Sequence, residues 1–398
     1  MKIPYVMLAL LLAALNTIGP FAVDTYLPAF PSIGAGLHAT QLELQQSLTA
    51  YMLPFSFMML WHGAISDAVG RKSVIIVGQI VFALASLLCA TAPNIETLWL
   101  GRVLQGLSAG AGVIVARAVI RDVLEGIAAQ RLMSHVAMVF AVSPAIAPII
   151  GGAIATTLGW RAVFFFLCAV ALALLLMTWK LLPETLPPEK RQSLHPAHLL
   201  AGYRSMLGSL PFVMLCLSMA LFFSGFFIYV MSAPVFLIQH LGLTATEFGW
   251  LFVPIVVGMI AGSALSAKLA GKLHPGGTIV LAYGIAAAAM LINLALSYSL
   301  VDSVATRIPQ ITLYTFGMSF AMPTLTLRAL DMFPHRRGMA ASCQGFIQTL
   351  IMAVVAGMVA PAIWDTTRHL AWGMVVGLLL SLAAYLISLR SYRVVNIS

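Results

Sequence analysis

Charged side chains are scarce in this sequence of 398 residues, of which Asp, Glu, Lys and Arg make up only 8%. In soluble globular domains about a quarter of the residues are charged. Hydrophobic residues account for 61% of the chain, and its mean hydropathy is +1.00. The scarcity of charge excludes a soluble globular protein, and the composition predicts an integral membrane protein.

Cysteine is also scarce, and motifs of common catalytic sites are missing. The four cysteines stand singly in apolar stretches, without CxxC spacing or a histidine at ligand spacing: Cys89, Cys168, Cys216 and Cys343. We expect them to pack in the interior, and we expect no metal site. The chain has no GxxxxGK(S/T) loop, no HExxH motif and no room for an ATPase domain. We therefore expect neither an enzyme nor a cofactor.

Long apolar runs are abundant. A transmembrane helix needs about 20 apolar residues to cross a hydrocarbon core of roughly 30 Å. The runs are continuous and exceed the about 10 residues of a membrane β-strand, so the predicted fold is all-α. They predict twelve transmembrane helices near residues 5–27, 47–66, 73–92, 97–117, 132–157, 161–182, 210–236, 248–268, 277–299, 305–327, 338–362 and 370–389.

The longest polar interval, residues 183–208, is rich in proline and divides the predicted helices into six and six. We predict an N-terminal six-helix bundle over 1–182, a cytoplasmic linker over 183–208 with a short surface helix near 195–204, and a C-terminal six-helix bundle over 209–398. Two pseudo-symmetric bundles, with the substrate site between them near the midplane, are typical of secondary transporters.

The basic residues predict the orientation. If the spans alternate from a cytoplasmic N-terminus, the Lys and Arg residues fall on one side of the membrane except for Arg102, Arg161, Arg307 and Arg368. Because basic residues concentrate in cytoplasmic loops, both termini are expected in the cytoplasm. The net charge of +9 therefore reflects topology and does not indicate a nucleic-acid partner.

Among the twelve Asp and Glu residues, only Asp24 lies well inside an apolar run, and Arg102 is the one base placed similarly. A charge in hydrocarbon costs roughly 2.5–3.5 kcal/mol, so intramembrane acids usually belong to ion or substrate pathways. Both residues lie at comparable depth, and we predict them as proton-coupling residues. Two alternatives stay open. Asp24 could simply meet interfacial water beside Tyr26 and Pro28, and Arg102 could be a purely structural partner.

Several motifs give the sequence a resemblance to a known family. In chain order they are DTYLPAFP from Asp24, GAISDAVGRK from Gly63, LWLGRVLQGLSAGAG from Leu98, ARAVIRD from Ala116, SPAIAPIIGG from Ser143 and LPET from Leu182. The chain resembles the major facilitator superfamily, and within it the twelve-span drug:H+ antiporters of the bicyclomycin-resistance (Bcr/CflA) type. Ala68 and Ala147 stand where many members carry a basic residue and a glycine.

The resemblance implies two mobile features. A conformational latch would close the inner side in the outward-open state, with Asp67 docked near Gly338 and Arg71 paired with Asp122. Its residues are Gly63, Asp67, Gly70, Arg71 and Asp122. The alternative is a solvated loop that only sets the topology. A hinge in the fifth span would consist of Pro144, Pro148, Gly151 and Gly152.

The resemblance also places polar, aromatic and sulfur-bearing side chains on the spans that line the cavity of this superfamily. The predicted substrate-binding residues are Asn16, Tyr51, Gln105, Phe222, Phe226, Tyr229, Tyr314, Met318, Gln344 and Gln348. Each alone is more often a packing residue, but together they predict a broad apolar pocket for varied amphipathic compounds.

These expectations converge on a proton-coupled multidrug efflux transporter, a drug:H+ antiporter that works by alternating access across a bacterial inner membrane. Its expected partners are small amphipathic drug-like substrates, protons and membrane lipid, and it is expected to act as a monomer. The alternative is a proton-coupled importer of a small metabolite on the same fold.

Overall fold

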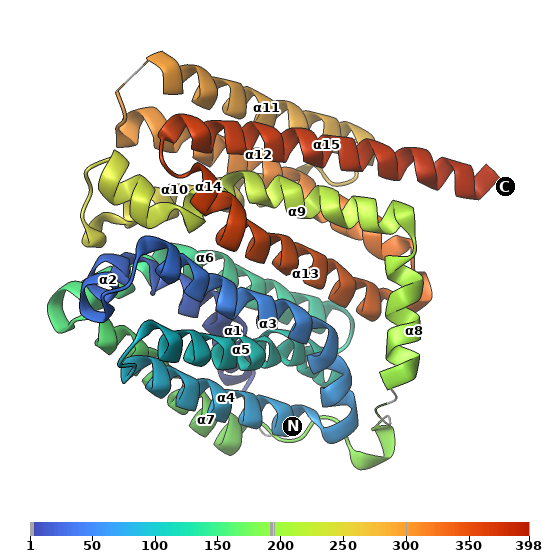
Figure 1. The fold of residues 1–398 in the computed structure, drawn as a ribbon. Helices are drawn as coiled ribbons and strands as arrows, with labels where there is room; N and C mark the ends of the chain where they lie inside the picture. Colours follow the sequence, from blue (N-terminus) through green and yellow to red (C-terminus); the bar gives the residue numbers. More distant parts are fainter. Residues whose placement is uncertain (1–3, 192–193, 195, 300, 398) are drawn as a thin grey trace. The chain divides into compact units, whose positions relative to one another are not determined.

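The computed structural model describes residues 4–191, 194, 196–299 and 301–397. These residues form helices and connecting turns, and no strand occurs among them. The chain divides into two compact units, Met1–His195 and Pro196–Ser398. Each unit is a bundle of long helices (Figure 1). The predicted all-α membrane fold is therefore confirmed.

Within the described residues, eleven helical segments are long and apolar enough to cross a membrane. The first extends further than predicted, because the helical path from Tyr5 continues to Leu37 rather than ending near residue 27. The predicted span 305–327 lies on α12 (Val304–Asp331), a helix of 28 residues that is not among the eleven. Its threonines and the charged Arg307 and Arg328 lower the mean hydropathy of this helix.

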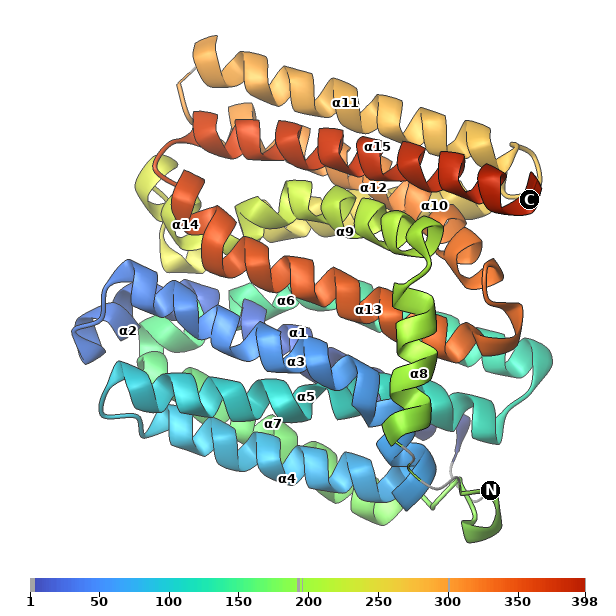
Figure 2. The ribbon, with the colours of Figure 1, turned by 45° about the vertical axis from the view of Figure 1, so that its right-hand side comes forward.

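The first unit contains the elements α1 (Tyr5–Asp24), η1 (Leu27–Ala29), α2 (Phe30–Leu37), α3 (Gln41–Val69), α4 (Arg71–Ala90), α5 (Ile95–Val123), α6 (Gly126–Leu158), α7 (Trp160–Leu181) and η2 (Pro188–Lys190). Helix α5 packs against α1, α3 and α4, while α6 packs against α1 and α7 against α4. Figure 2 shows α3, α4 and α5 running alongside one another.

Local sequence signals set the helix ends that matter for the site. At the start of α3, the Thr40 hydroxyl accepts a hydrogen bond from the Glu43 N–H at 3.3 Å, and the Glu43 carboxylate accepts from the Thr40 N–H at 2.7 Å. At the start of α5, the Asn94 side chain accepts from the Thr97 N–H at 3.0 Å. Such caps satisfy N–H groups that have no partner inside the helix.

Glycines bring α5 very close to its neighbours. A Cβ atom at Gly106 would overlap the Tyr51 carbonyl of α3, and one at Gly112 would overlap the Leu15 carbonyl of α1. Small residues allow helix backbones to approach closely in membranes. This close approach sets Arg102, one turn before Gly106, against side chains and backbone of α1 and α3.

The second unit contains α8 (Pro196–Leu207), α9 (Leu210–Met231), η3 (Pro234–His240), η4 (Ala245–Glu247), α10 (Gly249–Leu269), α11 (Pro275–Ser299), α12, η5 (Pro334–Arg336), α13 (Arg337–Val354), η6 (Val355–Val359), α14 (Ala360–Ile363) and α15 (Thr367–Ile397). Helix α9 packs against α13 and α15, and α12 packs against α10 and α11. The short helix expected near residues 195–204 is α8, although His195 itself lies outside the described residues.

Candidate functional site

Asp24 is the last residue of α1, and its side chain is buried with 7% exposure. The Thr25 hydroxyl and N–H both bond back to the Phe21 carbonyl, so the chain keeps its helical path beyond Asp24. The membrane-spanning segment continues to Leu37. Asp24 therefore lies inside the spanning segment rather than at its end, which weighs against the interfacial alternative.

Arg102 is completely buried in α5. Its Nη1 donates to the Ala22 carbonyl of α1 at 3.1 Å and to Gln105 Oε1 at 2.8 Å. The Gln105 amide in turn donates to the Ser86 hydroxyl of α4 at 2.8 Å. The guanidinium is thus held by hydrogen bonds that join α1, α4 and α5.

Two tyrosine rings face the same guanidinium. Its central carbon lies 4.9 Å from the Tyr26 ring centroid and 4.4 Å from the Tyr51 ring centroid. A cation over an aromatic face gains about 0.5–2 kcal/mol, depending on its desolvation. Arg102 Nε and Nη2 are buried and have no hydrogen-bond partner within the described part of the chain. The positive charge is therefore only partly compensated.

Asp24 and Arg102 do not form an ion pair among the described residues. Ala22, whose carbonyl binds Arg102, precedes Asp24 by less than a turn. The Tyr51 hydroxyl lies within electrostatic reach of both charges and donates to the Gly19 carbonyl at 2.9 Å. The site therefore contains a buried acid, a guanidinium with unused donors and a tyrosine beside both.

The predicted latch residues meet at one end of the first unit. Arg71 Nη1 lies 2.5 Å from Asp67 Oδ1, and Arg71 Nε donates to Asp122 Oδ2 at 3.0 Å. The Ser66 hydroxyl also accepts from Arg71 Nη1 at 2.6 Å. Arg71 thus brings α3, α4 and α5 together, as the implied pairing of Arg71 with Asp122 requires. Whether this cluster works as a latch stays a prediction.

Glu184 belongs to the same cluster and was missed by the sequence analysis. Its Oε1 accepts from the Arg71 N–H at 2.9 Å, and its Oε2 accepts from the Lys72 N–H at 3.2 Å. Gly70, with a φ of 103°, leaves the space for this carboxylate. A negative charge at a helix N-terminus is stabilising. The available signal was the acid of the LPET motif, but nothing in the sequence links it to α4.

The remaining latch and hinge residues have distinct surroundings. Gly63 faces the Ile114 side chain with room for a Cβ atom. Pro144 and Pro148 lie inside α6, and a Cβ atom at Gly151 would overlap the Thr25 backbone, beside Asp24. Gly152 is buried in α6. The proline segment thus packs on the part of α1 that carries Asp24, while its action as a hinge stays a prediction.

The predicted substrate-binding residues in the first unit differ in whether their polar side-chain atoms have hydrogen-bond partners. Tyr51 and Gln105 are buried and bonded within the unit. Asn16 has 3% exposure, and its Oδ1 has no partner within the described residues. Asn16 therefore has an acceptor available that the other two lack.

In the second unit most predicted substrate-binding residues are buried in helix packing. Tyr314 donates to the Phe222 carbonyl at 3.0 Å, and Tyr229 accepts from Asn293 at 2.7 Å. Phe226 and Met318 are buried, whereas Gln344 and Gln348 are half-buried. Gln344 makes a long contact of 3.5 Å to the Thr326 hydroxyl. The two glutamines are thus the more accessible members of the set, and the lining role of all ten residues stays a prediction.

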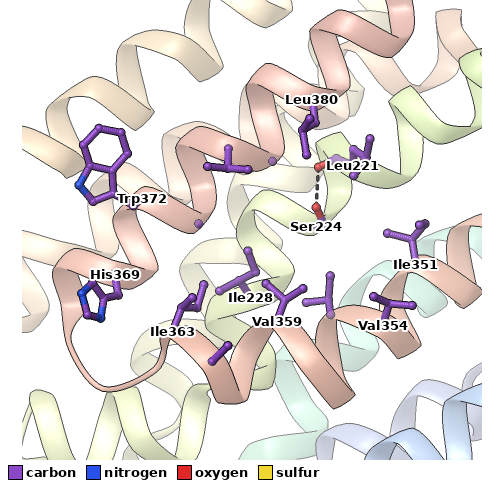
Figure 3. Close-up of a pocket in the computed structure, with 15 residues that line it drawn as sticks. Leu221, Ser224, Ile228, Ile351, Val354, Val359, Ile363, His369, Trp372 and Leu380 are labelled. Atoms are coloured by element: carbon purple, nitrogen blue, oxygen red, sulfur yellow. Dashed lines mark hydrogen bonds between the residues drawn. The ribbon is translucent and has the colours of Figure 1, made fainter.

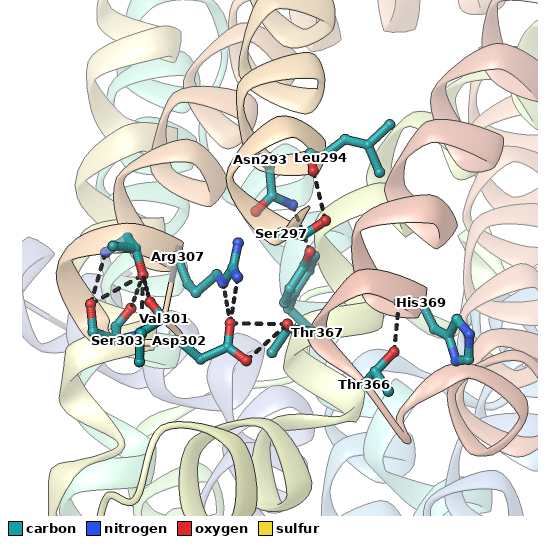
Figure 4. Close-up of polar contacts among 12 residues, drawn as sticks. Asn293, Leu294, Ser297, Val301, Asp302, Ser303, Arg307, Thr366, Thr367 and His369 are labelled. Carbon is teal, nitrogen blue, oxygen red and sulfur yellow. Dashed lines mark hydrogen bonds and ion pairs between the residues drawn. The ribbon is translucent and has the colours of Figure 1, made fainter. Parts of the chain in front are cut away.

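The second unit also buries an ion pair that the sequence analysis did not anticipate. Arg307, at the start of α12, has 1% exposure, and its Nε donates to Asp302 Oδ1 at 2.5 Å. The Thr367 hydroxyl lies 3.0 Å from both Asp302 oxygens and joins the start of α15 to this pair (Figure 4). The pair was missed because Arg307 was treated only as a loop charge on the outer side.

The comparison with known families decides the identity of the fold. Residues 7–357 match the family described as Major Facilitator Superfamily. The chain belongs to this superfamily. It is therefore a multi-span membrane transporter, and its family consists of transporters rather than enzymes. The predicted family membership is confirmed.

Curated relatives cover most of this superfamily member. It is 31% identical to "Uncharacterized MFS-type transporter YdgK" of Bacillus subtilis (strain 168), covering 88% of each chain. It is 26% identical to "Bicyclomycin resistance protein homolog" of Haemophilus influenzae, covering 94% of each chain. It is 28% identical to "Multidrug resistance protein D" of Escherichia coli (strain K12), covering 89% of this chain and 88% of the relative.

Solved structures support the fold. The crystal structure of a D-xylose-proton symporter aligns with a TM-score of 0.73 at 15% identity, covering 96% of this chain and 98% of the other. A bacterial homolog of the human lysosomal transporter Spinster aligns with a TM-score of 0.71 at 16% identity, covering 99% and 98%. At such identities the likeness concerns the architecture alone.

Proposed function

We propose that this transporter exports amphipathic, drug-like compounds from a bacterial cytoplasm in exchange for protons, by alternating access across the inner membrane. The names of the relatives support this direction, since two of them are a multidrug resistance protein and a bicyclomycin resistance protein homolog. The distribution of Lys and Arg supports an orientation with both termini in the cytoplasm.

The observation that carries the proton coupling is the partly compensated charge at Arg102. Asp24 is buried inside a spanning segment, two residues after Ala22, whose carbonyl binds Arg102, and Arg102 Nε and Nη2 have no partner within the described residues. When Asp24 loses its proton, its negative charge competes with the Ala22 carbonyl and the tyrosine rings for Arg102. When Asp24 binds a proton, Arg102 returns to these neutral partners. Protonation thereby changes which contacts join α1 and α5.

The electrochemical gradient supplies the energy for this exchange. Moving one charge across a potential of 100 mV yields about 2.3 kcal/mol. A proton that enters while a neutral compound leaves therefore has a usable driving force. The proposal needs no nucleotide or other cofactor.

The cluster at Arg71 is proposed as the inner latch. Asp67 keeps 43% exposure of its side chain, so it is the member of the cluster that is free to take a new partner. Arg71, in contrast, has only 8% side-chain exposure and is held by Asp122. The backbone bonds from α4 to Glu184 fix the position of Arg71. A fixed arginine and an exposed acid are suited to making and breaking one contact per transport cycle.

The substrate contacts are proposed to be mainly apolar. Phe222, Phe226 and Met318 offer no hydrogen bonds, while Asn16, Gln344 and Gln348 offer a small number of polar contacts. A pocket with few fixed polar groups accepts compounds of varied shape. This chemistry fits amphipathic substrates better than sugars, which require many hydrogen bonds.

The test measures uptake of a cationic and a neutral dye into inverted membrane vesicles, the direction that corresponds to export. A proton gradient is imposed, and wild type is compared with Asp24→Asn at equal membrane expression. We expect gradient-driven uptake in wild type and background uptake in the variant. The matched control is Asp331→Asn, which removes an acid whose side chain keeps 59% exposure in its pair with Arg337.

Each alternative result has a defined meaning. Equal transport by wild type and Asp24→Asn would place the proton site elsewhere. Transport of neither dye in inverted vesicles, with gradient-driven accumulation of a small metabolite in whole cells, would replace export by import.

A further inference from the structure

An apolar groove lies within the second unit, between α9, the segment from α13 to α14, and α15. Its volume is about 540 Å³. Figure 3 shows side chains from these three parts converging on it, with His369 and Trp372 at one end and Ile351 toward the other. The groove is therefore elongated along the helices, a shape suited to a chain-like ligand.

An irregular helical segment forms one wall of the groove. The wall segment η6 is a π-helical turn between α13 and α14, and its Val355 and Val359 line the groove. On the opposite side, α15 contributes Gly373, which packs closely against the Ile363 and Ile228 side chains, and Gly377, which packs against α9. π-helical turns inside α-helices frequently occur at functional sites. The groove thus borders an irregular segment of a kind that is common at functional sites.

The ligand that fits the groove is apolar. Apart from Ser224 and His369, the lining side chains are aliphatic, glycine or Trp372. The Ser224 hydroxyl is already bonded to the Leu221 carbonyl at 2.7 Å, so it offers no unused donor. Val376 and Leu380 on the rim are about half exposed, at 50% and 51%. The helices that form the groove are long and apolar enough to cross a membrane, so hydrocarbon chains are the apolar ligands available to it.

Polar and aromatic residues mark one end of the groove. The Trp372 indole N–H donates to the Tyr298 hydroxyl at 3.1 Å, and the Arg368 guanidinium lies 4.1 Å from the Tyr298 ring centroid. Trp and Tyr concentrate where the membrane meets water. His369 is exposed at this end and lines the groove, and Asp365 is exposed in the preceding turn. Charges of both signs therefore lie near the end of the groove that carries His369 and Trp372.

We propose that this groove binds a zwitterionic phospholipid, with one acyl chain between α9, η6 and α15 and its phosphate beside Arg368 and His369. The amino group of the head group would lie toward Asp365. The bound lipid would fill the space that the π-helical turn opens beside α9. This site is independent of the proposed drug export, since it requires only that the protein spans a membrane.

The test is photo-crosslinking of the full-length protein in vesicles of phosphatidylethanolamine and phosphatidylglycerol. The probe is a phosphatidylethanolamine with a diazirine in one acyl chain, and mass spectrometry maps the labelled peptides. We expect labelling of residues 351–363 and 372–380 several times above that of other exposed apolar faces. Val359→Trp, which fills the groove, should reduce this labelling at least about fivefold.

The matched control is Val280→Trp, the same change on α11 at a position with 71% exposure outside the groove. It should leave the labelling unchanged. Labelling that is even over all apolar faces, or equal in Val359→Trp and wild type, would overturn the site. Displacement of the probe by a transported dye but not by unlabelled phospholipid would replace the lipid by substrate.

Competition by unlabelled lipids distinguishes binding of the head group from binding of the acyl chain. Unlabelled phosphatidylethanolamine should compete better than phosphatidylglycerol, and both better than a diacylglycerol with the same chains. Arg368→Ala and His369→Ala should reduce the advantage of phospholipid over diacylglycerol while the groove peptides remain the labelled ones. Equal competition by all three lipids would overturn the assignment of the head-group end.

Discussion

Each unit has an arginine with at most 1% exposure near the N-terminal end of a long helix, Arg102 in α5 and Arg307 in α12. Both side chains are withdrawn from solvent, with exposures of 0% and 1%. A tyrosine from a neighbouring helix accompanies each, Tyr51 for Arg102 and Tyr229 for Arg307. The two arginines therefore occupy similar positions in their units, whereas the groups that neutralise their positive charge differ.

Arg307 has a carboxylate partner and Arg102 has none at ion-pair distance. Asp302 binds Arg307 directly, and Thr367 binds Asp302 from α15. Arg102 relies on a carbonyl, an amide and two aromatic rings. A buried charge without a counter-charge is costly, so it is expected where function requires it rather than where stability does. The comparison is consistent with the proposal that Arg307 is an anchor and Arg102 the exchangeable group.

The largest expected effect on stability comes from breaking the ion pair between Asp302 and Arg307. Asp302→Ala leaves Arg307 buried without its counter-charge. We expect a loss of about 3 kcal/mol in the free energy of unfolding, the lower end of the range for buried pairs, because the Asp302 side chain keeps 31% exposure. Denaturant unfolding of the protein in detergent micelles, followed by circular dichroism, measures this loss.

The matched variant is Asp24→Ala in the other unit. Asp24 makes no ion pair among the described residues, so its removal should change the free energy of unfolding by less than about 1 kcal/mol, although we expect it to stop transport. Equal destabilisation by Asp302→Ala and Asp24→Ala would contradict the distinction between an anchor and an exchangeable group.

A double-mutant cycle sharpens the same comparison. For Asp302→Ala with Arg307→Met we expect a coupling energy of about 2 kcal/mol. Each single variant leaves the charge of the remaining residue without its partner. For Asp24→Asn with Arg102→Met we expect a coupling below about 0.5 kcal/mol in unfolding, because neither residue depends on the other in this structure. A large coupling between Asp24 and Arg102 would show that they pair directly in the dominant state.

The tyrosines should give smaller effects. Tyr51→Phe removes the bond to the Gly19 carbonyl but keeps the ring over Arg102, at an expected cost of about 1 kcal/mol. Tyr51→Leu also removes the cation–π contact and should cost about 1 kcal/mol more. Unfolding measurements compare the two variants, with Tyr314→Phe as the control that loses one hydrogen bond away from any arginine. Identical stabilities of Tyr51→Phe and Tyr51→Leu would exclude a contribution of the ring.

The sequence was sufficient for features that depend on local composition. Apolar runs predicted the membrane-spanning helices, and the placement of Asp24 and Arg102 inside such runs agrees with their burial, while their role in proton coupling stays a prediction. The partnership of Arg71 with Asp122 followed from motif resemblance and is present in the structure. Even the polar helix α12 was recognised, although its apolar content is low.

Features that depend on contacts distant in sequence were not accessible in the same way. Glu184 reaches the start of α4 across more than one hundred residues, and Thr367 reaches Asp302 from another helix. The engagement of Arg102 by Tyr26, Tyr51 and Ala22 requires the close approach that Gly106 and Gly112 allow. No periodicity or spacing reports which side chains such an approach brings together.

The smallest expected effect concerns Glu184. Its carboxylate accepts hydrogen bonds from backbone N–H groups, whereas Asp302 pairs with an arginine side chain. Glu184→Gln keeps one acceptor oxygen but removes the negative charge at the start of α4, at an expected cost of about 0.5–1 kcal/mol. Hydrogen exchange at the Arg71 and Lys72 amides should accelerate severalfold, because these amides lose a charged acceptor. Glu189→Gln, an exposed change in the same interval, is the control and should leave this exchange unchanged. If the amides exchange at the same rate in both variants, the carboxylate does not hold the start of α4, and the position of Arg71 depends on its side-chain contacts with Asp67, Ser66 and Asp122.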